Sequence, residues 1–216
     1  MIFEANNLSI EINQKKIITD FTLSVKAGDF VGITGKSGTG KTTLINNLSL
    51  LEKTYIGRLN YERFENTKKN RQMIRKNVIS YMFQNYGLLE NMTVLENLKL
   101  AIKYNKSFKT SDLTILLEKF SLAESILTKK VFLLSGGEQQ RIALIRSLLK
   151  PFEVIFADEP TGNLDEENAA FIIEYFHHLV TEKQKAVVMV THDNQLLKYA
   201  SVVVDLDCEK VFENTI

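Results

Sequence analysis

Two glycine-rich segments contain side chains and backbone groups that could bind and act on a phosphate. The first, residues 35–42, has the pattern Gly-x-x-x-x-Gly-Lys-Thr, which places a lysine and a hydroxyl among flexible backbone positions. Such a loop can curl so that successive N–H groups point at phosphate oxygens. The second, residues 134–141, reads Leu-Ser-Gly-Gly-Glu-Gln-Gln-Arg and lies far along the chain. The first pattern predicts that a nucleoside triphosphate is bound.

The elements around residues 35–42 favour this interpretation over an ordinary glycine-rich loop. Residues 29–34 predict a buried strand, and residues 43–48 predict the first turns of a helix, whose positive end would favour an anion. Chance alone would produce the pattern in about 1% or fewer of chains of this length. Lys41 would reach the β- and γ-phosphates, and the Thr42 hydroxyl would bind Mg²⁺. The expected contacts with the nucleotide are Gly35, Lys36, Ser37, Gly38, Thr39, Gly40, Lys41, Thr42 and Thr43.

Two other predicted strands end in side chains that could act on a phosphate. Residues 154–157 are apolar and lead into Asp158 and Glu159, while residues 186–190 lead towards His192. Ligands of α/β sheets bind at the carboxyl ends of the strands. We therefore expect Asp158 to hold Mg²⁺ through water, Glu159 to activate or orient the attacking water, and His192 to hydrogen-bond the γ-phosphate and that water. The plain alternatives are a solvated acidic turn and a structural histidine.

The second glycine-rich segment has two interpretations. Ser135 and Glu138 match a capping box at the start of a helix expected over about 137–149. A cap alone does not need two glycines, which destabilise the first turn of a helix. Exposed N–H groups at a helix start suit an anion. Because this segment is distant from residues 35–42, it could serve a different nucleotide.

Taken together, these motifs resemble the nucleotide-binding subunit of ABC transporters. The resemblance covers nearly the whole chain: Walker A at 35–42, the Q-loop at Gln84, the signature at 134–138, Walker B at 154–159, the D-loop at 162–165 and the switch residue His192. It implies that Gln84 contacts Mg²⁺ and water, and that Ser135 and Gly137 bind the γ-phosphate of an ATP held by a second copy. It also implies that Asp165 contacts the opposing Walker A loop.

The order of the predicted elements indicates an α/β fold. Strands at about 2–12, 16–26 and 57–61, and a helix near 67–76, precede a helical stretch, after which strands and helices alternate again. In the helical stretch, Thr93 and Glu96 are expected to cap one helix, and Ser111 or Asp112 is expected to start another. A helix over about 165–182 has an apolar stripe that is expected to pack on the sheet, formed by Ala169, Ile172, Ile173, Phe176 and Val180. We expect a P-loop NTPase with a parallel-sheet ATP-binding core, an antiparallel β subdomain and a helical insertion, as in ABC ATPases. The single domain would span 1–216, with its core at 1–87 and 150–216 and the signature subdomain at about 88–149.

Residues 157–165 and 85–100 are similar to one ABC subgroup, which serves lipoprotein release, macrolide export, and bacteriocin or antimicrobial-peptide export. In that subgroup residues 85–100 would form part of the groove for the permease. One departure concerns Ile12, which falls where ABC domains usually carry an aromatic residue against adenine. An aliphatic side chain lacks the stacking contribution of about 1 kcal/mol, so weaker ATP binding is expected.

Composition narrows the possible functions. The 216 residues are 44% hydrophobic with a net charge of +1, so no strong basic field points to nucleic acid. The longest apolar run has five residues, which predicts no membrane helix, and the single cysteine excludes an intramolecular disulfide. We expect a homodimer that binds ATP and Mg²⁺ and works with a separate permease on the cytoplasmic face of a bacterial membrane. The alternatives are a mechanical ABC ATPase that regulates cell-wall hydrolases, a soluble ABC ATPase, and a P-loop kinase.

Overall fold

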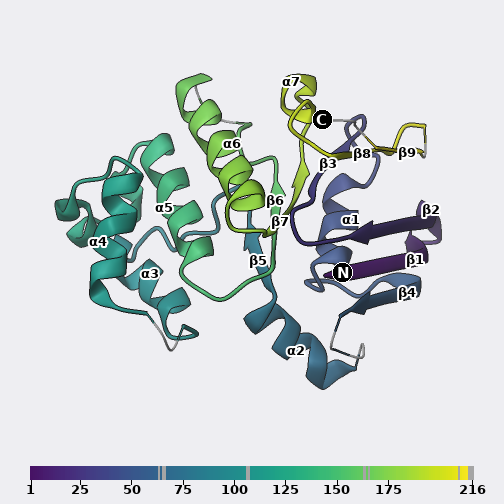
Figure 1. Ribbon diagram of the computed structural model, residues 1–216, viewed down its shortest axis with the longest axis horizontal. Coiled ribbons are helices and arrows are strands. Elements are labelled where there is room, and N and C mark those ends of the chain that lie inside the picture. The colour runs from purple at the N-terminus through teal and green to yellow at the C-terminus, as the bar shows by residue number, and fades with distance from the viewer. Residues whose placement is uncertain are drawn as a thin grey trace.

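The computed structural model describes residues 1–62, 64, 67–105, 108–162, 164, 166–208 and 210–213. Within these ranges the strands form two sheets, and a cluster of helices lies at the opposite end of the molecule from the smaller sheet (Figure 1). The smaller, antiparallel sheet has the order β2-β1-β4 and consists of β1 (Phe3–Ile12), β2 (Lys15–Val25) and β4 (Tyr55–Tyr61). This sheet confirms the antiparallel β part expected from the resemblance.

The larger sheet has the order β5-β6-β7-β3-β8-β9 and is parallel except for its last strand. Its strands are β3 (Phe30–Thr34), β5 (Ile79–Met82), β6 (Val154–Asp158), β7 (Ala186–Val190), β8 (Val202–Asp205) and β9 (Lys210–Glu213). The strands β3, β6 and β7 are neighbours at the centre. Their carboxyl ends therefore lie side by side, which brings together three segments that are distant in the sequence.

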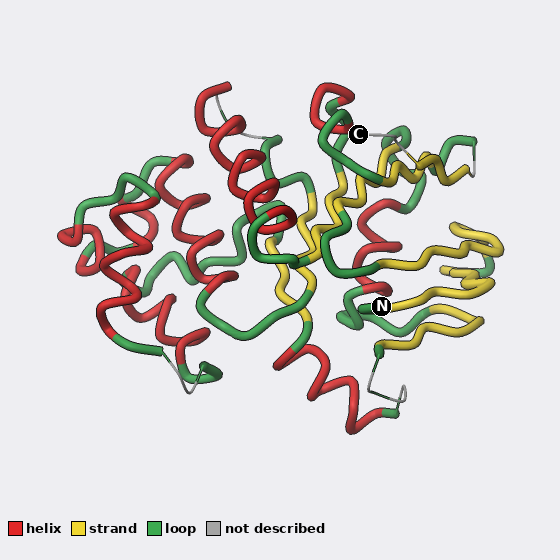
Figure 2. Tube along the Cα trace, viewed as in Figure 1, coloured by secondary structure: helices red, strands yellow, loops and turns green. Residues whose placement is uncertain are grey.

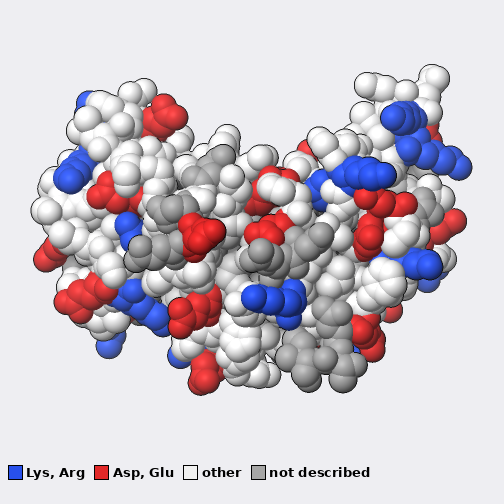
Figure 3. Space-filling model, turned by 90° about the horizontal axis from the view of Figure 1, so that it is seen from above, with Lys and Arg blue, Asp and Glu red and all other residues white. Residues whose placement is uncertain are grey.

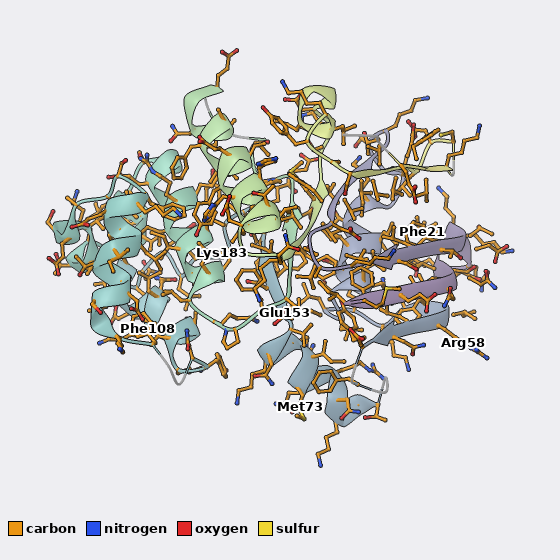
Figure 4. All side chains as sticks on the ribbon, viewed as in Figure 1. Phe21, Arg58, Met73, Phe108, Glu153 and Lys183 are labelled. Carbon is orange, nitrogen blue, oxygen red and sulfur yellow. The ribbon has the colours of Figure 1, made fainter. Side chains whose placement is uncertain are left out.

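Both faces of the central strands are buried, and alternate residues along each strand pack in two different hydrophobic cores. In β6, Val154 and Phe156 pack in the core on the side of α1 (Lys41–Leu48) and the antiparallel sheet. Phe21, labelled in Figure 4, belongs to that same core. Ile155 and Ala157 face the core shared with the helices on the other side. This continuous burial explains why β6 and β7 read as apolar runs.

The helical part expected over about 88–149 lies together at one end of the molecule (Figure 2). It contains α3 (Val94–Ile102), α4 (Thr110–Lys119), the short turns η1 (Glu124–Thr128) and η2 (Val131–Leu133), and α5 (Gly136–Leu148). The expected Thr93–Glu96 capping box of α3 is confirmed. Helix α4 begins one residue before the expected start at 111 or 112, because Asp112 Oδ2 accepts from Lys109 N and so caps the helix end.

The described part of the chain contains three further helices: α2 (Lys68–Asn77), α6 (Glu166–Thr181) and α7 (Asn194–Leu197). The apolar stripe of α6 packs on the sheet as expected, with Ile172, Ile173 and Phe176 buried. Helix α7 was not expected, because its four residues are too few for a helical period to show in the sequence. On the face drawn in Figure 3, acidic and basic side chains are interspersed, in keeping with the near-neutral net charge.

Candidate nucleotide-binding site

The phosphate loop connects β3 to α1, as the sequence predicted. Gly35 and Gly40 have φ values of 144° and 96°, in the region that favours glycine. A Cβ on Gly40 would also collide with the Ile17 side chain, and one on Gly35 would lie 2.9 Å from Thr39 Oγ1. These two positions therefore require glycine for both conformation and space. The resulting bend ends at the N-terminus of α1, where backbone N–H groups and the helix dipole favour phosphate.

Lys41 is the buried cation at the centre of this loop. The residue is only 9% exposed, and Nζ donates to Gly35 O at 2.7 Å and to Lys36 O at 2.8 Å. The two carbonyl groups hold the ammonium inside the curve of the loop. Its position is thus set by the backbone of the loop itself.

A cavity of about 620 Å³ brings most of the expected residues together. It is lined by Ile17, Gly35, Lys36, Ser37, Gly38, Gly40, Lys41, Thr42, Thr43, Gln84, Glu159 and His192. The lining joins β2, the phosphate loop, the segment after β5 and the ends of β6 and β7. Such a cavity, with one buried cation and several backbone N–H groups, suits a triphosphate.

Asp158 and Thr42 form the expected pair of oxygen donors. Thr42 Oγ1 donates to Asp158 Oδ1 at 3.3 Å, and Asp158 is only 4% exposed. Burial raises the pKa of Asp158 and the charge of Glu159 adds to the rise, while the Thr42 hydrogen bond and the charge of Lys41 oppose it. The described residues contain no cluster of three His, Cys, Asp or Glu side chains that would hold a metal alone. A hydroxyl and a carboxylate beside a phosphate site nevertheless fit Mg²⁺, which takes most of its ligands from water and phosphates.

Glu159 and His192 meet across the ends of β6 and β7. Glu159 Oε2 lies 3.3 Å from His192 Nδ1, and the Glu159 amide donates to Val190 O at 3.0 Å. Glu159 has a φ of 46°, an uncommon conformation for a residue other than glycine, of the kind that clusters at functional sites. The His192 side chain is 64% exposed, so its ring remains accessible from the cavity. This pair has the chemistry needed to orient and deprotonate a water molecule.

Ser135 is both a helix cap and an available donor. Its Oγ accepts from Glu138 N at 3.2 Å, and Glu138 Oε2 accepts from Ser135 N at 2.8 Å. The hydroxyl proton of Ser135 has no acceptor among the described residues, and the side chain is exposed. The capping and anion-binding interpretations are therefore compatible. Neither Ser135 nor Gly137 lines the cavity around Lys41.

Of the other expected residues, Thr39, Asp158 and Ile12 do not line the cavity, and Asp165 lies outside the described residues. Ile12 ends β1 and is 37% exposed, and it does not line the cavity. Ile17, across the β1–β2 turn, does line it. Asp165 lies outside the described residues, so its expected contact with a second copy stays a prediction.

Sequence reasoning missed Ile17, Arg146 and Asp207. Ile17 looked like an ordinary strand residue. Arg146 of α5 donates to Gly87 O at 2.6 Å and to Tyr86 O at 3.0 Å, which ties the helix of the signature to the segment after Gln84. Burial lowers the pKa of Arg146. In the sequence, the only indication of a role for Arg146 was that a charged residue lies in the largely apolar second half of this helix.

Fold and site together define a P-loop nucleoside triphosphatase. Residues 18–162 match the family model described as ABC transporter. The chain is 40% identical over 196 residues to the lipoprotein-releasing system ATP-binding protein LolD of Protochlamydia amoebophila, covering 87% of this chain and 85% of that protein. It is 34% identical over its full length to the macrolide export ATP-binding/permease protein MacB of Campylobacter jejuni, but it spans only 34% of that protein.

Among solved structures, the chain is similar over its full length to the ATP-binding cassette MJ0796, a dimer in a post-hydrolysis state with ADP and Pi, with a TM-score of 0.88 and 28% identity. The chain belongs to the ATP-binding family of ABC transporters and is an ATP hydrolase of that family. The resemblance to the lipoprotein-release and macrolide-export subgroup is confirmed. Within the described ranges, no helix is long and apolar enough to span a membrane.

Replacing Ile12 by Tyr should tighten ATP binding about fivefold, because a stacked ring contributes about 1 kcal/mol. Calorimetric titration of the chain with ATP would measure this change. Ile56→Tyr, at a 74% exposed position on β4 of the same sheet, is the matched control and should leave the affinity unchanged. Equal affinities for Ile12→Tyr and the unmodified chain would show that Ile12 does not face the base.

Proposed function

We propose that two copies of this chain close around two ATP molecules and thereby drive a separate integral membrane permease. The protein would act at the cytoplasmic face of a bacterial membrane, in the export or extraction of a peptide, lipoprotein or antimicrobial. The observation that carries the proposal is the 40% identity, over most of both chains, to the ATP-binding protein of a lipoprotein-releasing system. The macrolide relative is named as both ATP-binding and permease protein, which supports a membrane partner for a chain that covers only a third of it.

The separation of the two glycine-rich segments supports the dimer. Ser135 is exposed and does not line the cavity that contains Lys41. In a head-to-tail dimer, the α5 N-terminus of one copy would complete the cavity of the other. The hydroxyl of Ser135 and the N–H groups at that helix end would then donate to the γ-phosphate.

A groove beside β5 supports a protein partner. This second cavity, of about 490 Å³, lies among α2, α3, α5 and β5, next to the segment after Gln84. Its walls are partly apolar and include Leu51, Phe83, Leu100 and Tyr104, which are 38–40% exposed. We assign this groove, which includes part of residues 85–100, to the cytoplasmic segment of the permease.

The charge of the groove indicates which side chains that permease segment presents. Four cations line it and no Asp or Glu does: Arg75, Lys76, Arg146 and Lys150. None of them takes part in an ion pair among the described residues. Burial, together with the charge of Arg75, lowers the pKa of Lys150 to about 8. A partner helix with apolar and acidic side chains would compensate this charge.

The cavity residues would have distinct roles in ATP hydrolysis. Lys41 would bind the β- and γ-phosphates and stabilise the transferred group, with help from Ser135 of the second copy. Thr42, Gln84 and, through water, Asp158 would hold Mg²⁺, which when bound would neutralise phosphate charge. Glu159 would take the proton of the attacking water, and His192 would orient that water against the γ-phosphate.

A mechanical ATPase that regulates cell-wall hydrolases remains the second candidate, because the same ATPase would serve both. Purification from membranes of the Glu159→Gln chain with ATP, followed by identification of the bound integral protein, separates the two. A permease partner supports export or extraction. Binding to DNA or ribosomes with no membrane protein would contradict the proposal.

A charge-reversal variant tests whether the membrane protein captured in that purification binds in the groove. Lys150→Glu should abolish capture of the membrane partner, because it would repel an acidic segment, while ATP binding stays unchanged. Lys183→Glu, at an exposed position beyond the end of α6 (Figure 4), is the matched control and should capture as well as the unmodified chain. Equal capture by both variants would remove the partner from this groove.

A further inference from the structure

The turn between β8 and β9 contacts the start of the phosphate loop. Both carboxylate oxygens of Asp207 accept from Lys36 N, at 3.1 and 3.2 Å, and Leu206 N donates to Thr34 O at 3.0 Å. Asp207 N in turn donates to Asp205 Oδ1 at 2.8 Å, which holds the turn in place. A residue near the end of the chain thus contacts a loop that begins at residue 35.

This contact determines the orientation of one peptide group. In a planar trans peptide, the carbonyl of Gly35 and the N–H of Lys36 point in opposite directions. Because Asp207 holds that N–H, the Gly35 carbonyl must point the other way, where it accepts from Lys41 Nζ at 2.7 Å. Gly35 itself does little to restrict this peptide, since glycine rotates freely about its backbone bonds. Asp207 supplies the restraint that the sequence of the loop lacks.

The next carbonyl along the chain, that of Lys36, also accepts from the Lys41 ammonium. Lys36 O accepts from Lys41 Nζ at 2.8 Å and from Thr39 Oγ1 at 3.0 Å. The approach of the turn is close, because a Cβ on Gly35 would lie 3.3 Å from Leu206 Cβ and 3.6 Å from Asp207 Oδ1. A continuous set of contacts therefore runs from the Asp207 carboxylate through the Gly35–Lys36 peptide to the Lys41 ammonium.

We propose that Asp207 is a positioning residue for ATP binding, which acts by fixing the Gly35–Lys36 peptide so that its carbonyl holds Lys41 in the phosphate site. The competing explanation is that Asp207 only stabilises the fold. Asp207 is an exposed carboxylate beside a loop built to bind an anion. Its charge opposes a nearby triphosphate, so its placement favours binding only through the preorganisation of Lys41.

Replacement of Asp207 tests this role. Asp207→Ala should raise the KM for ATP and the calorimetric Kd about tenfold, the scale of one hydrogen bond to a charged group. The kcat at saturating ATP should stay within about twofold, because bound phosphate then fixes Lys41. Asp207→Asn keeps an acceptor for Lys36 N and should restore most of the affinity. Cys208→Ala, in the same exposed turn, is the control and should leave KM unchanged.

Separate outcomes distinguish the explanations. An unchanged KM in Asp207→Ala would overturn the proposal, and so would tighter ATP binding, which would mean that charge repulsion dominates. An equal rise in KM in Cys208→Ala would show that Asp207 only stabilises the fold. The same conclusion would follow if the rise in KM in Asp207→Ala were matched by a lower unfolding temperature without nucleotide. Recovery in Asp207→Asn with all unfolding temperatures unchanged would support the positioning role.

Discussion

Glu159→Gln should lower the rate of ATP hydrolysis by about 10²–10⁴-fold, the scale of losing a general base. Glutamine has nearly the same shape but cannot accept the proton of the attacking water. The cavity, Lys41 and the Thr42–Asp158 pair would remain, so ATP should still bind. The variant should therefore accumulate as an ATP-bound dimer, which gel filtration with and without ATP would detect alongside steady-state turnover.

Glu153→Gln provides the matched control. Glu153 immediately precedes β6, at the end of the strand opposite Glu159, and Figure 4 labels it. Its carboxylate pairs with Lys185 Nζ at 3.0 Å and is 54% exposed, so removing its charge should cost little stability. Turnover should be unchanged. Near-normal hydrolysis by Glu159→Gln would remove Glu159 from the role of general base and leave His192 as the nearest candidate.

Ser135→Asp should lower turnover about 10²-fold or more and prevent ATP-dependent dimerisation. Aspartate caps a helix as well as serine does, so α5 should stay folded. The new carboxylate would, however, face the γ-phosphate held by the second copy, where a hydroxyl donor is worth about 10²–10³-fold. Sedimentation with ATP in the Glu159→Gln background would measure the loss of the dimer.

Ser135→Asn separates charge from capping. Asparagine is an equally good cap and remains a neutral donor, so turnover should fall much less than in Ser135→Asp. A mixture of Ser135→Asp with a Lys41→Ala chain should recover part of the activity, because one of the two sites in the mixed dimer contains neither change. Equal losses in Ser135→Asp and Ser135→Asn, with no recovery on mixing, would place Ser135 in a structural role only.

Much of the fold was predictable because its signals are local. The apolar runs of β6 and β7, the apolar stripe of α6 and the Thr93–Glu96 cap each depend on neighbouring residues, and the structure confirms them. Predictions failed where local signals were weak. Helix α7 is too short to show a period, and the start of α4 was misplaced by one residue because Asp112 caps the helix from its third position.

Residue types and their spacing were enough to predict which groups would act on a phosphate. Lys41, Asp158, Glu159 and His192 follow from residue type and spacing, because phosphate binding and water activation need those groups at the ends of strands and at a helix start. Which distant segments support these groups became clear only from the fold. Asp207 reaches Lys36 N across 171 residues, and Arg146 reaches Gly87 across 59. The partners in such contacts depend on strand order and helix packing, which no local sequence pattern indicates.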